Sequence, residues 1–163
     1  MDLFIAIFQG IIIASTPLVL AAVGELVVEK SGVLNLGVEG MMIIGAVTSF
    51  IVTYETGSHF LGLIAAVISA GLVASLFGLL TQYLLSNQVA TGLALTLFGL
   101  GLASLIGQTY SGISLDAFPV FDVYLLTEIP IIGNLLFNFD YLIYLSIIIV
   151  VSVYYFLNKT KLG

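Results

Sequence analysis

The sequence contains no cysteine, a single histidine and only three basic residues among 163. Without cysteine, a disulfide framework and thiolate chemistry are both excluded. A net charge of −6 with no arginine leaves nothing to neutralise phosphates, which excludes a nucleic-acid-binding protein. The sequence has no metal-spaced cluster, phosphate-binding loop or nucleophile–base pair, so we expect neither an enzyme nor a bound cofactor.

Charged residues as a group are also scarce. They make up 7% of the chain, against about a quarter in soluble globular proteins, and 61% of the residues are hydrophobic. Asp, Glu, Lys and Arg are absent from residues 3–24, 40–54, 56–115 and 141–158. A transmembrane helix needs about 20 consecutive apolar residues. The composition therefore predicts a protein that crosses a lipid bilayer several times.

The hydrophobic runs predict an all-α fold, a bundle of about five transmembrane helices that forms one membrane region over residues 1–163. The expected spans are residues 3–23, 37–54, 60–85, 89–107 and 141–157. Pro17 lacks a backbone N–H and is expected to kink the first span. Residues 108–140 mix four acidic residues and two prolines with aromatics. They predict an external loop, which can include a short interfacial helix.

The stretch between the first two spans, residues 31–40, is apolar but interrupted by glycines at positions 32, 37 and 40. Gly32 is suited to end a helix, and Lys30 before it is well placed at the negative end of the helix dipole. Residues 37–54 would form a helix of only about 27 Å. We therefore expect residues 31–40 to be a discontinuous or re-entrant lead into the second span.

The lysines indicate an orientation. With five crossings and the N-terminus outside, the turn near residue 30 and residues 159–161 face the cytoplasm, so all three lysines lie inside. The opposite orientation would place all three outside. This count holds only if residues 31–40 do not cross the membrane by themselves.

Small residues recur at four-residue spacing in three of the expected spans. Such stripes are typical of membrane helix contacts, because small residues let two backbones approach closely. The fifth span has no stripe and is expected at the periphery of the bundle. The stripes are Ala6, Gly10 and Ala14 in the first span, Ala66, Ala70, Ala74 and Gly78 in the third, and Gly99, Ala103 and Gly107 in the fourth.

A few polar residues stand near or inside the spans. Glu39 lies among apolar residues, where a carboxylate is costly without a partner or a water-filled cavity. Two interpretations stay open: Glu39 lines or braces a translocation path, or it is a buried tether to Lys30 or to free amides of the broken segment. Asn35, in glycine-broken backbone, is a better candidate for solute contact than Thr91 and Thr96, whose hydroxyls we expect to bond carbonyls of their own helix.

Four stretches resemble the permeases of bacterial ABC transporters of the branched-chain amino acid/ribose type, especially the branch that imports nucleosides and simple sugars. The longest comprises Gly24-Glu25 and then EKSGVLNLGVEGMMIIGA at residues 29–46. The others are NQVATGLALT at 87–96, IPIIGN at 129–134 and KTKLG at 159–163, in the order that the family has them. The resemblance spans most of the chain but only the N-terminal half of such a permease, so we expect a fragment or a split gene product.

This resemblance implies a multi-pass subunit of the bacterial cytoplasmic membrane, with its N-terminus outside, that forms a solute path together with a second permease subunit. It also implies cytoplasmic ATP-binding subunits that hydrolyse the ATP, and an extracytoplasmic solute-binding protein. On this basis we expect Asn35, Glu39, Asn87 and Thr91 to lie near the path of a nucleoside or simple sugar.

Two other classes of function remain open. One is an ion-coupled carrier or channel that uses Glu39 as a titrating group; uptake without an ATPase would favour it. The other is a membrane scaffold that transports nothing, which the absence of neighbouring genes for an ATPase or a solute-binding protein would favour.

Overall fold

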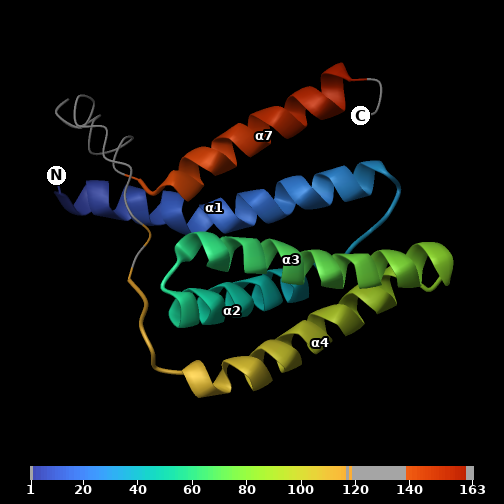
Figure 1. Ribbon diagram of the computed structural model, residues 1–163. Helices are drawn as coiled ribbons and strands as arrows, with labels where there is room; N and C mark the ends of the chain where they lie inside the picture. The colour runs from blue at the N-terminus through green and yellow to red at the C-terminus, as the bar shows by residue number, and fades with distance from the viewer. Residues whose placement is uncertain (1, 117, 119–138, 161–163) are drawn as a thin grey trace. The chain divides into compact units, whose positions relative to one another are not determined.

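The computed structural model describes residues 2–116, 118 and 139–160 (Figure 1). It contains five helices that are long and apolar enough to cross a membrane, which confirms the all-α, polytopic prediction. A short π-helix and a short 3-10 helix extend two of them. In chain order the elements are α1 (Asp2–Lys30), α2 (Val38–Thr56), α3 (His59–Gly78), η1 (Leu79–Tyr83), α4 (Gln88–Gly107), η2 (Gln108–Tyr110) and α7 (Tyr141–Lys159). The expected interfacial helix in the loop lies outside the described residues.

The chain divides into two compact units. One comprises Met1–Val27 and Ala117–Gly163, and the other comprises Val28–Asp116. The second unit contains α2, η1 and the helices α3 and α4, together with the last turn of α1 and the broken segment that follows it. It holds all the polar residues that the sequence marks as candidates for the solute path.

The first helix is longer than the first expected span. It continues through Pro17 and ends at Lys30, because charged residues end a membrane span without ending a helix. At its end the N–H of Val33 bonds the carbonyl of Val28, and the N–H of Gly32 bonds the carbonyl of Glu29. With Gly32 at φ +85°, this pair of bonds is a Schellman motif, which confirms the predicted glycine cap.

A two-residue turn joins α2 to α3. Gly57 ends α2 in the left-handed conformation, at φ +69°, and the Ser58 side chain accepts a hydrogen bond from the N–H of Leu61 at the start of α3. The two helices then pack closely along their length. The Gly62 backbone lies against Thr53 and Ser49 of α2, so tightly that no larger side chain has room at position 62.

The helix α2 is the centre of its unit, since α3 and α4 both pack on it and make little contact with each other. The buried cluster draws on all three helices: Met41, Ile44, Val73, Phe77 and Leu95. The first turn of α2 packs on α4 through a contact between Gly40 and Gly99. A Cβ added to Gly99 would lie 2.6 Å from the Cα of Gly40, so the two backbones are in direct contact.

The small-residue stripes are confirmed in part. On α3, Ala66 and Ala70 face Gly45 of α2, and on α4, Gly99 and Ala103 are buried. Among the described residues, however, a Cβ added to Gly10 or to Gly78 would meet nothing within 4 Å. A stripe of small residues therefore marks a helix contact only over part of its length.

In the other unit, α1 and α7 line a shallow groove of about 240 Å³ and run in the same direction (Figure 1). The hydroxyl groups in this groove bond carbonyls of their own helices: Thr16 bonds Ile12 at 2.8 Å, and Ser146 bonds Ile143 at 2.7 Å. These two hydroxyl groups are thus satisfied within their own helices.

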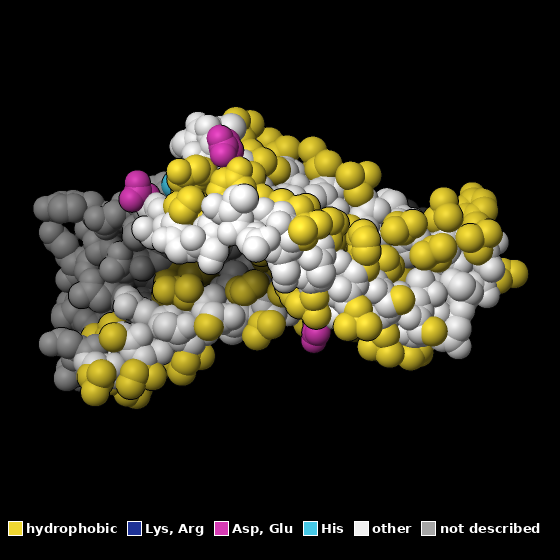
Figure 2. Space-filling model, turned by 90° about the horizontal axis from the view of Figure 1, so that it is seen from below, with side chains coloured by type: hydrophobic (Ala, Val, Ile, Leu, Met, Phe, Trp, Pro, Cys, Tyr) yellow, Lys and Arg dark blue, Asp and Glu magenta, His cyan; other side chains and the backbone are white. Residues whose placement is uncertain are grey.

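The surface is largely apolar. Figure 2 shows hydrophobic side chains spread along the helices, with acidic side chains at only a few points of the face in view. Large apolar side chains such as Leu97 and Leu105 are each 71% exposed, which is unfavourable in water and favourable in contact with lipid. Together with the five long apolar helices, this surface defines a multi-pass membrane protein.

Candidate functional site

The broken segment between α1 and α2 lies directly on the backbone of α4. Asn35 and Gly37 are buried there, in a stretch that is not helical. A Cβ added to Gly92 of α4 would lie 2.8 Å from the backbone nitrogen of Leu36. Only glycine at position 92 allows the segment to approach this closely, which confirms the expected discontinuity and explains how it is accommodated.

Asn35 shapes the turn that leads into α2. Its side-chain oxygen accepts a hydrogen bond from the N–H of Gly37 at 2.9 Å, and its amide nitrogen lies 3.7 Å from the sulfur of Met41. The residue is only 7% exposed. The Asn35 side chain therefore stabilises the irregular backbone of its own segment. Asn side chains commonly bond the backbone two residues further on in this way.

Two side chains of α4 bond the segment from outside. The side-chain oxygen of Gln88 accepts a hydrogen bond from the N–H of Leu34 at 2.9 Å. The Thr96 hydroxyl donates to the carbonyl oxygen of Leu36, also at 2.9 Å. The expectation that Thr96 bonds its own helix is thus wrong. With the Gly37 N–H held by Asn35, the N–H groups of Leu34 and Gly37 can donate to a solute only if their present bonds break. The carbonyl oxygen of Leu36 keeps a second lone pair for another donor.

Thr91 and Asn87 lie at the start of α4. The side-chain oxygen of Asn87 accepts from the N–H of Ala90 at 3.0 Å and so caps the helix. Thr91 pairs with the hydroxyl of Ser86 at 2.9 Å, rather than with a carbonyl of its own helix as expected. Because Ser86 donates its proton to the carbonyl of Leu80 at 2.8 Å, Thr91 is the donor in this pair.

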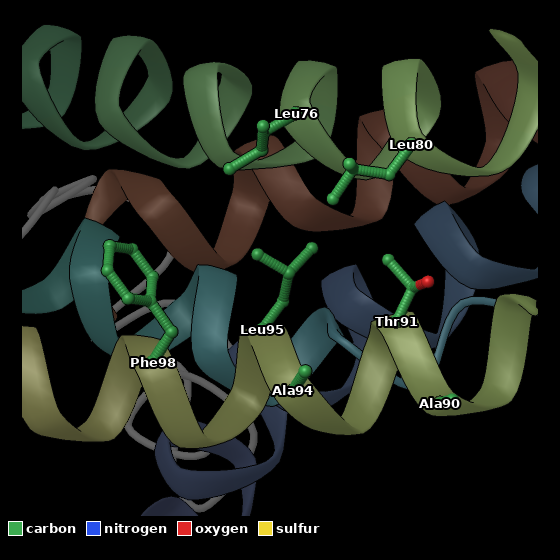
Figure 3. Close-up of a pocket in the computed structure, with 7 residues that line it drawn as sticks. All are labelled: Leu76, Leu80, Ala90, Thr91, Ala94, Leu95 and Phe98. Atoms are coloured by element: carbon green, nitrogen blue, oxygen red, sulfur yellow. The ribbon is translucent and has the colours of Figure 1, made fainter. Parts of the chain in front are cut away.

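Thr91 also lines an open cavity of about 490 Å³ between α3–η1 and α4. Figure 3 shows Leu76 and Leu80 on one side of the cavity and Thr91, with the other lining residues of α4, on the opposite side. The remaining lining is apolar: Leu76, Leu80, Ala90, Ala94, Leu95 and Phe98. The cavity thus offers one hydroxyl group and no charge.

Glu39 lies in the first turn of α2 and is exposed. In the part of the chain that the structure describes it forms no ion pair with Lys30, so the tether to Lys30 is wrong. The position favours a carboxylate, because the positive end of a helix dipole is there. Its exposure leaves the interpretation as a path residue open.

At the opposite end of the same unit, polar contacts join the end of α2 and the start of α3 to the residues after α4. The Tyr110 hydroxyl donates to Glu55 at 2.9 Å, and the rings of Tyr54 and Tyr110 meet edge to face. His59 bonds the carbonyl of Asp116 at 3.0 Å. Since Leu34 and Gln88 meet at the other end, α2, α3 and α4 alternate in direction, as the orientation argument requires.

The face of α4 that contacts the broken segment was not predicted from the sequence. Gln88, Gly92 and Thr96 recur at four-residue spacing, which places them on one side of a helix. This stripe mixes one small residue with two polar ones, so a search for small residues alone passes over it. Of the expected path residues, Asn35 lies in the segment and Thr91 lines the nearby cavity. Asn87 caps the start of α4, and Glu39 lies in the first turn of α2.

Comparison with known proteins identifies the family. The family described as "Branched-chain amino acid transport system / permease component" matches residues 7–163. The chain belongs to this family. No solved structure matches the chain.

Three curated relatives are similar over nearly the whole chain. The "Putative glucose ABC transporter permease protein TsgC13" of Haloferax volcanii is 39% identical over 92% of this chain and 47% of its own length. The nucleoside ABC transporter permease protein NupC of Lactococcus lactis is 29% identical over 96% of this chain and 53% of its own. The guanosine permease protein NupQ of Bacillus subtilis is 28% identical, with the same coverage. The chain spans about half the length of these relatives.

Proposed function

We propose that this chain is a permease subunit of an ABC importer, or the N-terminal half of one, and forms part of the path of a nucleoside or simple sugar. The observation that carries the proposal is the family match over residues 7–163. A discontinuous segment among membrane helices supports it, since transporters commonly build solute sites from such segments. All of residues 1–163 belong to this one permease region.

The chemistry of the candidate residues favours an uncharged, hydroxyl-rich solute. Asn35, Asn87 and Thr91 offer amide and hydroxyl groups, and the cavity beside Thr91 is otherwise apolar. The names of the relatives refer to glucose, nucleosides and guanosine. We place Asn35, Glu39, Asn87 and Thr91 near the path.

The transporter needs partners. ATP binds and is hydrolysed on separate cytoplasmic subunits, while a second permease subunit completes the path and an extracytoplasmic solute-binding protein delivers the solute. The permease itself hydrolyses nothing. ATP on the partner subunits biases the permease between an outward-open and an inward-open state, because a ligand shifts the equilibrium towards the state that it binds better.

The chain lies in the bacterial cytoplasmic membrane with its N-terminus outside. Lys30 and Lys159 support this orientation, because α1 and α7 run in the same direction and each carries a lysine in its last turn. Lysine is enriched on the cytoplasmic side of membrane proteins.

The test is uptake by vesicles that contain the complete importer with its ATPases and solute-binding protein. We expect ATP-dependent accumulation of labelled guanosine or glucose and no accumulation without ATP. Uptake driven by a proton or sodium gradient in the absence of the ATPases would instead establish an ion-coupled carrier. No uptake of any nucleoside or sugar, with correctly assembled protein, would contradict the proposal.

A further inference from the structure

The broken segment runs along α4 in a fixed register. Leu34 meets Gln88, Leu36 meets Gly92 and Thr96, and Gly40 meets Gly99. The contacts advance in the same direction along both stretches, from Gln88 to Gly99, which is 12 residues of α4. The segment therefore follows one face of the helix rather than crossing it at a point.

The two hydrogen bonds from α4 enclose Asn35. Gln88 holds the N–H of the preceding residue, Leu34, and Thr96 holds the carbonyl of the following residue, Leu36. The peptide group that precedes Leu34 and the one that follows Leu36 are thus attached to α4. Each bond ties a backbone group of the segment to α4 and so reduces the number of conformations that the segment can adopt.

We propose that Gln88 and Thr96 are positioning residues of the solute path. From α4 they fix the backbone around Asn35, so that the solute meets this segment in one conformation and the segment moves as part of α4. This inference rests on the proposed function, because it assigns the segment to the path. It adds two residues to the four that were expected near the path, and it explains how they act through Leu34 and Leu36.

At each position a pair of conservative variants separates the effect of losing the hydrogen bond from the effect of changing the size of the side chain. Thr96→Val keeps the shape of threonine and removes the donor, whereas Thr96→Ser keeps the donor. Gln88→Leu removes the acceptor, whereas Gln88→Glu keeps an acceptor oxygen at a helix start that tolerates a negative charge. Thr16→Val is the matched control, since it removes only a hydroxyl bond to a carbonyl of its own helix.

Two measurements on the complete importer test the inference. The first is the KM and the maximal rate of ATP-dependent uptake. Loss of one such bond frees the segment to sample other conformations, and we expect KM to rise about fivefold for Thr96→Val and for Gln88→Leu. The maximal rate should stay within about twofold of the original. In Thr96→Ser and Gln88→Glu, which keep the hydrogen bond, KM should stay close to the original value.

The second measurement is the mobility of a spin label at Leu36→Cys, an exposed position in a chain that has no other cysteine. Mobility should rise in Thr96→Val and stay unchanged in Thr96→Ser and Thr16→Val. Unchanged KM in the Val and Leu variants, or an equal change with Thr16→Val, would overturn the positioning role. If the original protein transports no solute, both the proposed function and the positioning role are contradicted. The mobility of the spin label then still shows whether Thr96 of α4 restrains the segment.

Discussion

Gly99 of α4 lies against Gly40 of α2 so closely that a Cβ on Gly99 would be 2.6 Å from both the Cα and the carbonyl oxygen of Gly40. A Cβ on Gly40 would in turn be 2.6 Å from the carbonyl oxygen of Leu95. Real Cβ atoms do not approach backbone atoms to this distance, so neither position can accept a side chain without moving a helix. This contact sets the distance between the broken segment and α4.

Gly99→Ala should therefore destabilise the protein by about 1–3 kcal/mol, the usual cost of overpacking a close contact. The control is Gly101→Ala on the same helix, where a Cβ meets nothing within 4 Å among the described residues. This variant should be neutral or slightly stabilising, because alanine is the better helix former. Unfolding in a detergent titration compares the two, and equal stability of the two variants would contradict the close contact.

A second prediction concerns the contact between α2 and α3. The hydroxyl groups of Thr48 and Ser69 lie 2.6 Å apart and form a hydrogen bond between the two helices. In a double-mutant cycle with Thr48→Val and Ser69→Ala, we expect a coupling free energy of about 0.6 kcal/mol, with an upper bound of about 1.7 kcal/mol. Ser75 bonds a carbonyl of its own helix, so a cycle with Ser75→Ala should show no coupling.

A third prediction concerns orientation. Because the chain has no cysteine, single substitutions can be labelled without background. In intact cells an impermeant maleimide should label Thr109→Cys, beyond α4, and should leave Ser31→Cys and Thr160→Cys unlabelled until the membrane is permeabilised. Labelling of Ser31→Cys from outside would reverse the proposed orientation. Labelling of Ser31→Cys and Thr109→Cys from the same side would contradict the alternation of α2, α3 and α4.

Charge-free runs predicted the helices well, since a membrane helix needs little more than length and hydrophobicity. The second to fourth helices begin within one residue of the expected spans, and the fifth begins at the expected Tyr141. The break after α1 was also predictable, because Gly32 adopts a φ of +85° that other residues avoid. The sequence carried no signal for the π-helix η1, which depends on the local hydrogen-bond register after Gly78.

The candidate site was predictable only in part. The importance of Asn35 follows from a polar residue in glycine-broken, apolar sequence. The bond from Thr96 to Leu36 joins residues 60 positions apart, so it depends on how α4 packs and not on any local pattern. Local reasoning assigned Thr96 and Thr91 to their own helices, because a threonine in an isolated helix has no better acceptor.

The claim that the segment around Asn35 lies in the solute path is tested most directly by replacing Asn35. ATP-dependent uptake by the complete importer is measured together with the amount of protein in the membrane. Asn35→Leu should abolish uptake of nucleoside or sugar while the protein still inserts. Asn35→Asp keeps the acceptor oxygen for the Gly37 N–H but cannot donate, so it preserves the turn and should still impair uptake. Normal uptake by Asn35→Leu would contradict the claim that this segment lies in the solute path.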